Sequence, residues 1–467
     1  MLNLEHAWNT GGMVRDTAMA DQSATFDDPL SMAGGPSGGD YPTLAVTFHV
    51  DASALGARRV LIGGPLVLGR RSEAFGPRVL DDGLLSREHL RLEPRADGVL
   101  AVDLNSRNGT FVNGQRIEEV MLTEGDVIGI GSVMFVYDKG PLAHETPRDP
   151  DLAGTSPQLA RLLADSDAVA SEAVTVLVEG ETGVGKERVA QRIHDRSGRE
   201  GRFVALNCGG IAEGLAQSEL FGHVRGAFSG ADGERAGLVE AAADGTLLLD
   251  EIGDASPALQ TTLLRLLENR EYRRVGSDEL RTTDARFVAA THVDLDEAVD
   301  AGGFRRDLLS RLRKWVIRVP PLRERRQDVI PIALAIARRN GRPKARFSRP
   351  LAQALLLSSW PDNVRGLAGA VEQALVESSG EQLELTPRLQ ERLAGAVQRT
   401  ASSEGPSVVA VERVAYEKRR PEPAYLRRRY VELGCNMKAF AGELGVARNT
   451  LYRWFEEAGI DPKTLRG

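Results

Sequence analysis

The sequence from position 180 to 187 reads Gly180-Glu181-Thr182-Gly183-Val184-Gly185-Lys186-Glu187. An apolar strand pattern precedes this turn, with valine at 174, 176 and 178, and an amphipathic helix pattern with Val189 and Ile193 follows it. Glycines let backbone N–H groups approach a polyphosphate without Cβ clashes, Lys186 adds a positive charge, and the helix N-terminus adds its dipole. The stretch predicts a phosphate-binding loop in an α/β domain, with a chance glycine turn as the alternative.

A second stretch, Thr246-Leu-Leu-Leu-Asp250-Glu251, favours the same interpretation. It has the pattern of a fully buried strand that ends in two carboxylates. A nucleotide site needs such groups on the strand beside the phosphate loop. We therefore expect Asp250 to help hold Mg²⁺ and Glu251 to orient or deprotonate the attacking water of a nucleoside triphosphatase.

Length and charge indicate that this site belongs to a larger protein. The chain has 467 residues, enough for several domains with buried cores. Its net charge is -7, but residues 1–42 hold one Arg and six acidic residues, whereas residues 411–467 hold twelve Lys or Arg and eight Asp or Glu. A basic C-terminal end predicts an anionic partner there. Two cysteines cannot form a disulfide framework, and no apolar run reaches a membrane span of about 20 residues, so we expect a cytoplasmic protein without membrane contact.

Changes of pattern along the chain predict a multidomain protein with all-β, α/β and all-α parts. We expect a disordered leader at 1–42, an antiparallel β-sandwich at 43–139, a linker at 140–152, an α/β domain at 153–325, a helical subdomain at 326–395, a second linker at 396–422 and a helical domain at 423–467. Short apolar runs between turn signals favour the sandwich, and alternation of strand and helix patterns favours a parallel sheet.

Within the α/β domain, the expected strands are 173–178, 203–207, 246–250 and 286–290, and a helix is expected over 257–269. Leu259, Leu263 and Leu266 lie on one face of that helix. Strand signals stop after Pro320. The remainder of this region is therefore expected to be helical.

Segment 43–139 carries polar loops that read Gly69-Arg70-Arg71, Ser86-Arg87-Glu88-His89 and Asn105-Ser106-Arg107-Asn108-Gly109-Thr110. It resembles a forkhead-associated (FHA) domain, which grips a phosphothreonine peptide with such loops. The resemblance implies that Arg70, Ser86 and Arg87 hold the phosphate, that Asn108 holds the peptide backbone with Arg107 beside it, and that His89 is a packed structural residue. Guanidinium and hydroxyl donors suit a phosphate dianion. A generic sandwich with solvated loops is the alternative.

The α/β domain contains Gly226-Ala227-Phe228-Ser229-Gly230-Ala231 inside an insertion that starts near Glu219. Phenylalanine between flexible glycines can serve as an exposed apolar probe, although Phe228 could instead pack into the core. The whole of 153–395 resembles the AAA+ domain of sigma-54-dependent transcriptional activators, the bacterial enhancer-binding proteins. In that family the insertion contacts the sigma factor, and its tip has Thr where this chain has Ser229.

The same resemblance implies roles for further residues. Lys186 would neutralise the ATP phosphates, Asn207 would couple Glu251 to the γ-phosphate, and Thr291 would stand at the sensor position. Arg305 and Arg311 would act as arginine fingers across a subunit boundary, and Arg365 would reach the nucleotide from the lid. Glu187 replaces the Ser or Thr that often follows the lysine, as it does in this family. The ATP site is then complete only in a homo-oligomeric ring, by resemblance a hexamer.

The C-terminal segment shows the pattern Leu444-Gly445-Val446 followed by a helix, which is typical of a helix-turn-helix. The second helix would present Arg448, Asn449, Thr450 and Arg453 to DNA, while Phe455 faces the core. The segment is similar to the Fis-type DNA-binding module, which docks as a dimer on an enhancer. A helical dimerisation module is the alternative.

These parts together predict an activator that binds enhancer DNA, hydrolyses ATP with Mg²⁺ and opens promoters bound by sigma-54 RNA polymerase. A phosphothreonine protein or a Ser/Thr kinase would regulate it through the FHA domain, in a signalling role comparable to a two-component system. Two other functions remain open. One is an AAA+ remodeller of a different client, and the other is an FHA adaptor or repressor with a vestigial ATPase.

Overall fold

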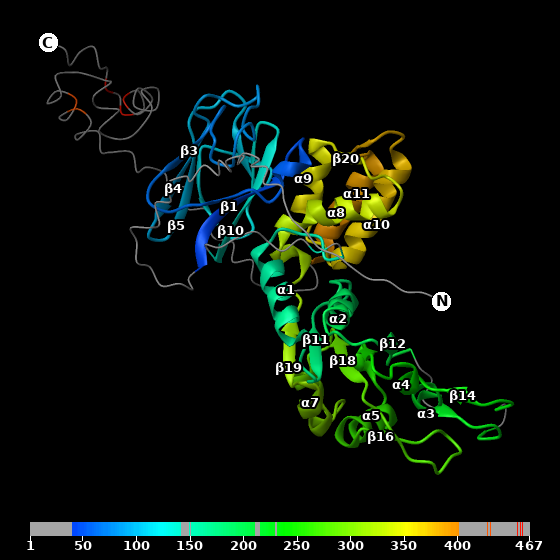
Figure 1. Cartoon of the computed structure of the whole chain (residues 1–467). Coiled ribbons are helices and arrows are strands. Elements are labelled where there is room, and N and C mark those ends of the chain that lie inside the picture. The colour runs from blue at the N-terminus through cyan, green and yellow to red at the C-terminus, as the bar shows by residue number, and fades with distance from the viewer. Residues whose placement is uncertain are drawn as a thin grey trace, which may run out of the picture. The chain divides into compact units, whose positions relative to one another are not determined.

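The computed structural model describes residues 40–141, 149, 151–210, 215–228, 231–400, 427, 430, 455, 458 and 460, with only the helical backbone over 394–400. The contacts divide the chain into two compact units, Met1–Thr400 and Ala401–Gly467. Figure 1 shows the chain coloured from its N-terminus to its C-terminus. In the described part of the chain, no helix combines the length and the apolar character that crossing a bilayer requires.

The N-terminal domain is the expected antiparallel β-sandwich. One sheet has the order β2-β1-β10-β9-β6-β7 and the other has the order β3-β4-β5-β8. The strands are β1 (Asp40–Phe48), β2 (Arg58–Val60), β3 (Leu66–Leu68), β4 (Leu90–Arg95), β5 (Gly98–Asp103), β6 (Thr110–Val112), β7 (Gln115–Ile117), β8 (Glu119–Leu122), β9 (Val127–Ile130) and β10 (Val133–Pro141), with a short 3₁₀ turn η2 at Ala52–Ala54. Leu44, Leu68, Leu90 and Phe135 are buried between the sheets. Alternating side chains of both sheets thus form one apolar core.

Two strands of the sandwich were not expected. β7 has two exposed polar residues out of three, Gln115 and Arg116, and β8 begins with the exposed Glu119. β7 lacks the apolar run by which the other strands were recognised, whereas β8 contains such a run after Glu119 that was overlooked. Both strands pair with one neighbour at the edge of their sheet, β6 for β7 and β5 for β8.

The α/β domain has a five-stranded sheet in the order β12-β15-β18-β11-β19, and every neighbouring pair is parallel. Its strands are β11 (Val176–Glu179), β12 (Phe203–Asn207), β15 (Thr246–Asp250), β18 (Arg286–Thr291) and β19 (Trp315–Arg318). Four of them match expected strands, although β11 begins at Val176 and not at 173. β19 was missed although its first three residues are apolar: it is an edge strand on which Trp315 and Arg318 are exposed.

Helices flank this sheet, as Figure 1 shows for α1 and α2 beside β11. They are α1 (Pro157–Ala170), α2 (Lys186–Asp195), α3 (Ala216–Phe221), α4 (Leu238–Ala241), α5 (Pro257–Asn269), α6 (Leu295–Asp300) and α7 (Arg306–Leu312), with the turn η3 at Ile252–Asp254. The prediction for α5 is confirmed in both its bounds and its buried leucine face. Ser256 caps this helix by accepting a hydrogen bond from the Leu259 backbone N–H, and Pro257 follows at the first helical position, where no N–H is needed.

Two short hairpins extend from the α/β domain near α3 and α5 (Figure 1). One pairs β13 (Gly222–His223) with β14 (Arg235–Ala236), and the other pairs β16 (Glu271–Tyr272) with β17 (Arg281–Thr282). The first hairpin belongs to the insertion that the sequence singled out.

The region after Pro320 is helical, with one correction. It contains the turns η4 (Leu322–Glu324) and η5 (Arg326–Asp328) and the helices α8 (Val329–Arg339), α9 (Arg349–Leu357), α10 (Asn363–Glu377) and α11 (Pro387–Thr400). β20 (Arg346–Phe347) and β21 (Gln382–Leu383) pair in parallel, so strand structure does not stop at Pro320. Two-residue strands are too short to leave a periodic pattern in the sequence.

The sandwich and the helical subdomain share one apolar cluster. Phe48, Val127 and Met134 from the sandwich are buried in the same cluster as Ile330 and Phe347 from the subdomain. Within the first compact unit, the FHA-like sandwich is therefore packed against the helices that follow the α/β sheet.

In the second unit, the structure describes five residues. Among them Tyr430 and Phe455 are fully buried, and their rings meet edge to face with centroids 5.1 Å apart. The expected core position of Phe455 is thus confirmed. Arg448, Asn449, Thr450 and Arg453, the expected DNA contacts, lie outside the described residues.

Candidate functional site

The phosphate loop connects β11 to α2, as the sequence predicts. Gly183 and Gly185 both have left-handed backbone conformations, with φ of 78° and 105°. Lys186 begins α2 with a side chain that is only 5% exposed, and its Nζ donates to the carbonyls of Gly180 at 3.0 Å and Glu181 at 3.4 Å. The amine is therefore held inside the loop, where the phosphates of a nucleotide would lie.

The helical subdomain closes over this loop. A Cβ on Gly183 would lie 2.4 Å from the Asp362 carbonyl oxygen and 3.1 Å from the Arg365 Cβ, so no larger residue fits there. The Val364 backbone N–H donates to the Gly183 carbonyl at 3.0 Å. Arg365, the expected lid residue, is thus brought directly to the phosphate loop.

Asn363 was not assigned a role from the sequence, yet it is the main polar connection between lid and loop. Its Nδ2 donates to Glu181 Oε2 at 3.0 Å and to the Thr182 carbonyl at 3.1 Å, and its Oδ1 accepts from the Leu322 N–H. It is fully buried and has a φ of 50°, a conformation that asparagine tolerates better than most residues. Its position as the first residue of α10 was the only available signal.

Glu181 is the acceptor at the other end of this connection. Arg323 grips its carboxylate through two nitrogens, at 2.8 and 2.6 Å. These hydrogen bonds lower the pKa of Glu181 despite its partial burial. The loop carboxylate is therefore ionised and tied to the start of the lid.

Asp250 and Glu251 stand at the carboxyl end of β15, next to the loop. Burial, together with the charge of Glu251, raises the pKa of Asp250. Burial also acts to raise the pKa of Glu251, but the hydrogen bond with His292 and the charge of Lys186 outweigh it, so the pKa of Glu251 lies below its usual value. The pKa values of the two adjacent carboxylates are therefore shifted in opposite directions, and Glu251 loses its proton more readily than Asp250.

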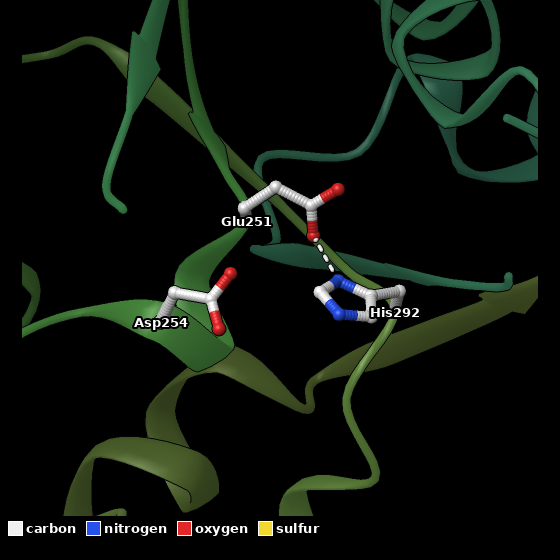
Figure 2. A group of neighbouring side chains, drawn as sticks. All are labelled: Glu251, Asp254 and His292. Carbon is white, nitrogen blue, oxygen red and sulfur yellow. Dashed lines mark hydrogen bonds and ion pairs between the residues drawn. The ribbon is translucent and has the colours of Figure 1, made fainter. Parts of the chain in front are cut away.

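Glu251 contacts both Lys186 and His292. Lys186 Nζ lies 3.5 Å from Glu251 Oε1, and His292 Nδ1 lies 2.7 Å from Glu251 Oε2. Figure 2 shows this hydrogen bond, with Asp254 facing the same space. One carboxylate oxygen of Glu251, one of Asp254 and one ring nitrogen of His292 all lie within 4.8 Å of one another. The sequence did not lead us to expect a role for His292, although it directly follows Thr291, the residue expected at the sensor position.

Asn207 and Thr291, the other two residues expected at the ATP site, lie near it but make hydrogen bonds to backbone groups and not to Glu251. Asn207 ends β12 opposite Asp250, and its Oδ1 accepts a hydrogen bond from the Gly210 N–H at 2.9 Å. Thr291 ends β18 with its Oγ1 accepting from the Val293 N–H at 3.0 Å. The register of the sheet therefore brings Asn207 and Thr291 to the edge at which β15 ends in Asp250. The residue that bonds directly to Glu251 is His292.

The two expected arginine fingers lie on and beside α7, away from the phosphate loop of their own chain. Arg305 makes a two-pronged ion pair with Asp307, at 3.0 and 2.7 Å, and Arg311 pairs with Glu268 at 3.1 Å. Both side chains are about half exposed. They are available to a neighbouring subunit only if these local pairs open.

The insertion exposes Phe228. Its side chain is 40% exposed and meets the His223 ring edge on, with centroids 5.0 Å apart. The Gly226 N–H donates to the Ala231 carbonyl and the Ala231 N–H donates to the Phe228 carbonyl, which closes the loop at its base. Ser229 and Gly230 lie outside the described residues. The phenylalanine is not buried in the domain core, which was the alternative.

Arg274 on the second hairpin ties down the base of this insertion. It forms ion pairs with Glu234 and Glu240, and the latter is gripped through two contacts at 3.0 and 2.8 Å. The guanidinium is largely buried. The two hairpins are therefore joined by charge-assisted bonds that carry more energy than neutral ones.

The polar loops of the sandwich come together at one place. The Arg70 backbone N–H donates to the Ser86 carbonyl, and a Cβ on Gly69 would lie 2.0 Å from the Arg87 carbonyl oxygen. Ser86 Oγ accepts from the Arg107 N–H at 3.0 Å, and Asn108 Nδ2 donates to the Leu84 carbonyl at 2.7 Å. The residues expected to bind phosphothreonine are thus neighbours.

His89 underlies these loops and is fully buried. The Ser86 N–H donates to its Nδ1 at 3.2 Å, and its Nε2 lies 3.1 Å from the Gly109 carbonyl oxygen. The expectation that it is a packed structural histidine is confirmed. By contrast, Arg87 and Arg107 are exposed.

A polar chain links the sandwich to the phosphate loop. Arg58 Nη2 donates to Gln327 Oε1 at 2.7 Å, and Gln327 Nε2 donates to Asp138 Oδ2 at 3.1 Å. The next residue, Asp328, is fully buried and lies 4.0 Å from Arg325, whose Nη2 donates to the Val184 carbonyl at 2.9 Å. The turn η5 therefore touches the sandwich, and Arg325, the residue before it, touches the backbone of the phosphate loop.

Comparison with known proteins agrees with this arrangement. Residues 66–131 match the FHA domain, residues 152–318 match the sigma-54 interaction domain, and residues 323–405 match the AAA+ ATPase lid domain. The chain thus combines an FHA domain, a sigma-54 interaction domain and an AAA+ lid.

The curated relatives that this chain matches are named as transcription regulators. The chain is 46% identical over 235 residues to the transcriptional regulatory protein ZraR of Klebsiella oxytoca, covering 49% of this chain and 53% of that protein. It is 42% identical over 299 residues to the nitric oxide reductase transcription regulator NorR1 of Cupriavidus necator, covering 61% and 58%. A crystal structure of NtrX from Brucella abortus in complex with ATP matches 68% of this chain and 71% of that chain, with 27% identity and a TM-score of 0.47. The chain spans about half the length of the curated relatives it matches.

Proposed function

We propose that this protein is a sigma-54-dependent transcriptional activator that uses ATP hydrolysis to convert a closed promoter complex of sigma-54 RNA polymerase into an open one. The observation that carries the proposal is the exposed Phe228 on the insertion of a sigma-54 interaction domain. An apolar ring held on a loop between glycines is suited to pressing against a protein partner. The match to family members over 152–318 supports sigma-54 as that partner.

The residues around the phosphate loop support ATP hydrolysis. Lys186 would neutralise the phosphates, and Asn363 and Arg365 would report nucleotide binding to the lid, because both touch the loop. Glu251, with its lowered pKa, is ionised and can accept a proton from water or orient it. Asp250 is the carboxylate that would hold Mg²⁺, which supplies charge neutralisation for phosphoryl transfer.

Completion of this site would require a second subunit. Arg305 and Arg311 are held by Asp307 and Glu268 at positions other than the phosphate loop of their own chain. A guanidinium at the transferring phosphoryl group is worth on the order of 10³-fold or more in rate. We therefore propose that a homo-oligomeric ring, a hexamer by resemblance, is the active form.

The sandwich would regulate the ring by binding a phosphothreonine protein, the product of a Ser/Thr kinase. The convergence of Arg70, Ser86, Arg87 and Asn108 supports phosphate binding. The contacts of Gln327 with Arg58 and Asp138 support coupling to the ATPase, because Arg325, two residues before Gln327, donates a hydrogen bond to the phosphate-loop backbone. Enhancer DNA would be bound by the C-terminal segment, to which the basic charge of residues 411–467 lends support.

The test measures ATP turnover against protein concentration, and capture of sigma-54 in the presence of an ATP transition-state analogue. We expect turnover to rise steeply with concentration and to change when a phosphothreonine peptide, but not its unphosphorylated form, is added. Wild type should capture sigma-54 and Phe228→Ala should not. Val376→Ala, which removes an exposed apolar side chain from α10, is the matched control and should capture it.

A second candidate function is remodelling of another client, which Ser229 at the loop tip favours. Normal turnover without capture of sigma-54 by wild type would establish this function and overturn the first. Absence of turnover at every concentration would instead support the adaptor or repressor alternative.

A further inference from the structure

The side chain of Glu251 starts from an unusual backbone position. Its φ of 49° is left-handed, and it forms the single-residue junction between β15 and η3. A glutamate has several rotatable bonds, so its carboxylate occupies one place only if other groups hold it there. For a residue that must orient a water molecule, misplacement by a fraction of an ångström slows the reaction.

Two groups hold this carboxylate, and they are not equivalent. Lys186 Nζ lies 3.5 Å from Oε1 and is within hydrogen-bond distance of two loop carbonyls as well. His292 Nδ1 lies 2.7 Å from Oε2, a close charge-assisted hydrogen bond (Figure 2). When phosphates enter the loop, Lys186 is the cation they attract, so the hydrogen bond from His292 is the one that remains.

The backbone that carries the imidazole is positioned by the sheet. β15 and β18 are neighbouring parallel strands, with Leu249 opposite Ala289, and His292 directly follows β18. A Cβ on Gly253 would lie 2.7 Å from Thr291 Oγ1 and 2.8 Å from Val293 Cβ. The segment that carries His292 is therefore packed tightly against the turn that follows Glu251.

We propose that His292 is a positioning residue for ATP hydrolysis, which holds the Glu251 carboxylate by donating a hydrogen bond from Nδ1 to Oε2. This assignment rests on the proposed ATPase function. It differs from the role expected for Asn207, whose amide oxygen is bonded to the Gly210 N–H. The imidazole does not touch the nucleotide in this role: it leaves Oε1 of Glu251 as the acceptor for water once Lys186 turns to the phosphates.

The test compares His292→Ala and His292→Asn with wild type in steady-state ATP hydrolysis at a protein concentration that saturates assembly. We expect His292→Ala to lower kcat by about 10- to 100-fold, as loss of an orienting partner does at other catalytic centres. KM and the affinity for a fluorescent ATP analogue should change by less than about threefold, because ground-state binding is untouched. His292→Asn retains a side-chain donor and should recover part of the loss.

His49→Ala is the matched control, since it removes an exposed imidazole of the sandwich that is bonded to Asp51. A kcat of His292→Ala within twofold of wild type would overturn the inference, as would equal loss in His292→Asn and His292→Ala. A fall in nucleotide affinity as large as the fall in kcat would show a structural role and would also overturn it. If wild type does not hydrolyse ATP, both the proposed ATPase function and the role of His292 are wrong. This result differs from one in which wild type hydrolyses ATP and the His292 variants do so equally well, which would overturn the role of His292 alone.

Discussion

Two regions of this molecule are proposed to bind phosphate, and they would do so with different parts of the chain. The phosphate loop uses backbone and a buried amine: Lys186 is held by loop carbonyls, and the lid covers Gly183. The sandwich uses exposed side chains on three converging loops, among them Arg87 and Arg107. The first site is shaped by the sheet and helices around it, whereas the second is shaped by hydrogen bonds among its own loops.

This difference predicts how strongly amino-acid substitutions affect each site. In the phosphate loop, side chains near the site also join the lid to the sheet, as Asn363 does, so chemistry and closure are coupled. In the sandwich, Arg87 projects from loops whose backbone is fixed by other residues, such as His89. We expect substitutions at the first site to have the larger effects.

The largest effect is expected for Lys186→Ala. Loss of the one amine held inside the loop removes charge neutralisation at the transferring phosphate, and ATP turnover should fall by about 10³-fold or more. Steady-state ATP hydrolysis measures this. Arg188→Ala is the control: it removes an exposed cation on the same helix, and its turnover should match wild type. Turnover above a tenth of wild type in Lys186→Ala would contradict the assignment.

An intermediate effect is expected for Arg87→Ala in the sandwich. If Arg87 contacts the phosphate as we propose, removing its exposed guanidinium should weaken binding of a phosphothreonine peptide by about 1.5–3 kcal/mol, the range for a hydrogen bond to a charged group. Calorimetric titration with phosphorylated and unphosphorylated peptide gives the two affinities. Arg91→Ala, which removes an arginine paired with Glu93 on β4, should bind as wild type does. If Arg87→Ala and Arg91→Ala bind alike, the phosphate does not contact Arg87.

The smallest effect is expected for Asp103→Asn, which tests the hydrogen bonds that shape the sandwich loops. Asp103 accepts from Ser106 Oγ at 2.6 Å, from the Ser106 N–H at 2.9 Å and from Thr110 Oγ1 at 2.7 Å. Burial acts to raise the pKa of Asp103, but these hydrogen bonds outweigh it and lower the pKa. The ionised carboxylate therefore stabilises the fold above its unfolded pKa of about 4, and this contribution is lost as the pH falls through the lower folded pKa.

At neutral pH we expect Asp103→Asn to destabilise the sandwich by about 1–2 kcal/mol, because an ionised acceptor is lost. The difference from wild type should shrink as the pH falls below about 4. Denaturant unfolding followed at several pH values measures both. A destabilisation that does not depend on pH would show that the ionised state of Asp103 contributes nothing.

Much of the fold could be predicted because its signals are local. Four of the five strands in the α/β sheet are continuous apolar runs, and α5 has its cap, its proline and its leucine face within one short stretch. Among the strands that were missed, β7, β8 and β19 are edge strands that are exposed on part of their surface. An edge strand is stabilised by pairing with its neighbour, and pairing leaves little trace in its own residues.

The residues of the candidate ATP site likewise fall into those that local sequence signals identified and those that only the structure identified. Lys186, Asp250 and Glu251 were identified from the sequence because a glycine loop and a buried strand that ends in carboxylates are recognisable by themselves. Asn363 and His292 were not, since their partners are far away along the chain: Glu181 is 182 residues from Asn363, and Glu251 is 41 residues from His292.

The sequence by itself therefore determined four strands of the α/β sheet, the helix α5 and the glycine loop before α2, because backbone preference and hydrophobic periodicity act over a few residues. Only the tertiary structure decided that His292 holds Glu251, that Asn363 joins the lid to the loop, and that Gln327 lies between Arg58 and Asp138. These contacts depend on the register of parallel strands and on the packing of separate domains. A hydrogen bond needs placement to within a few tenths of an ångström, and only the assembled core provides it.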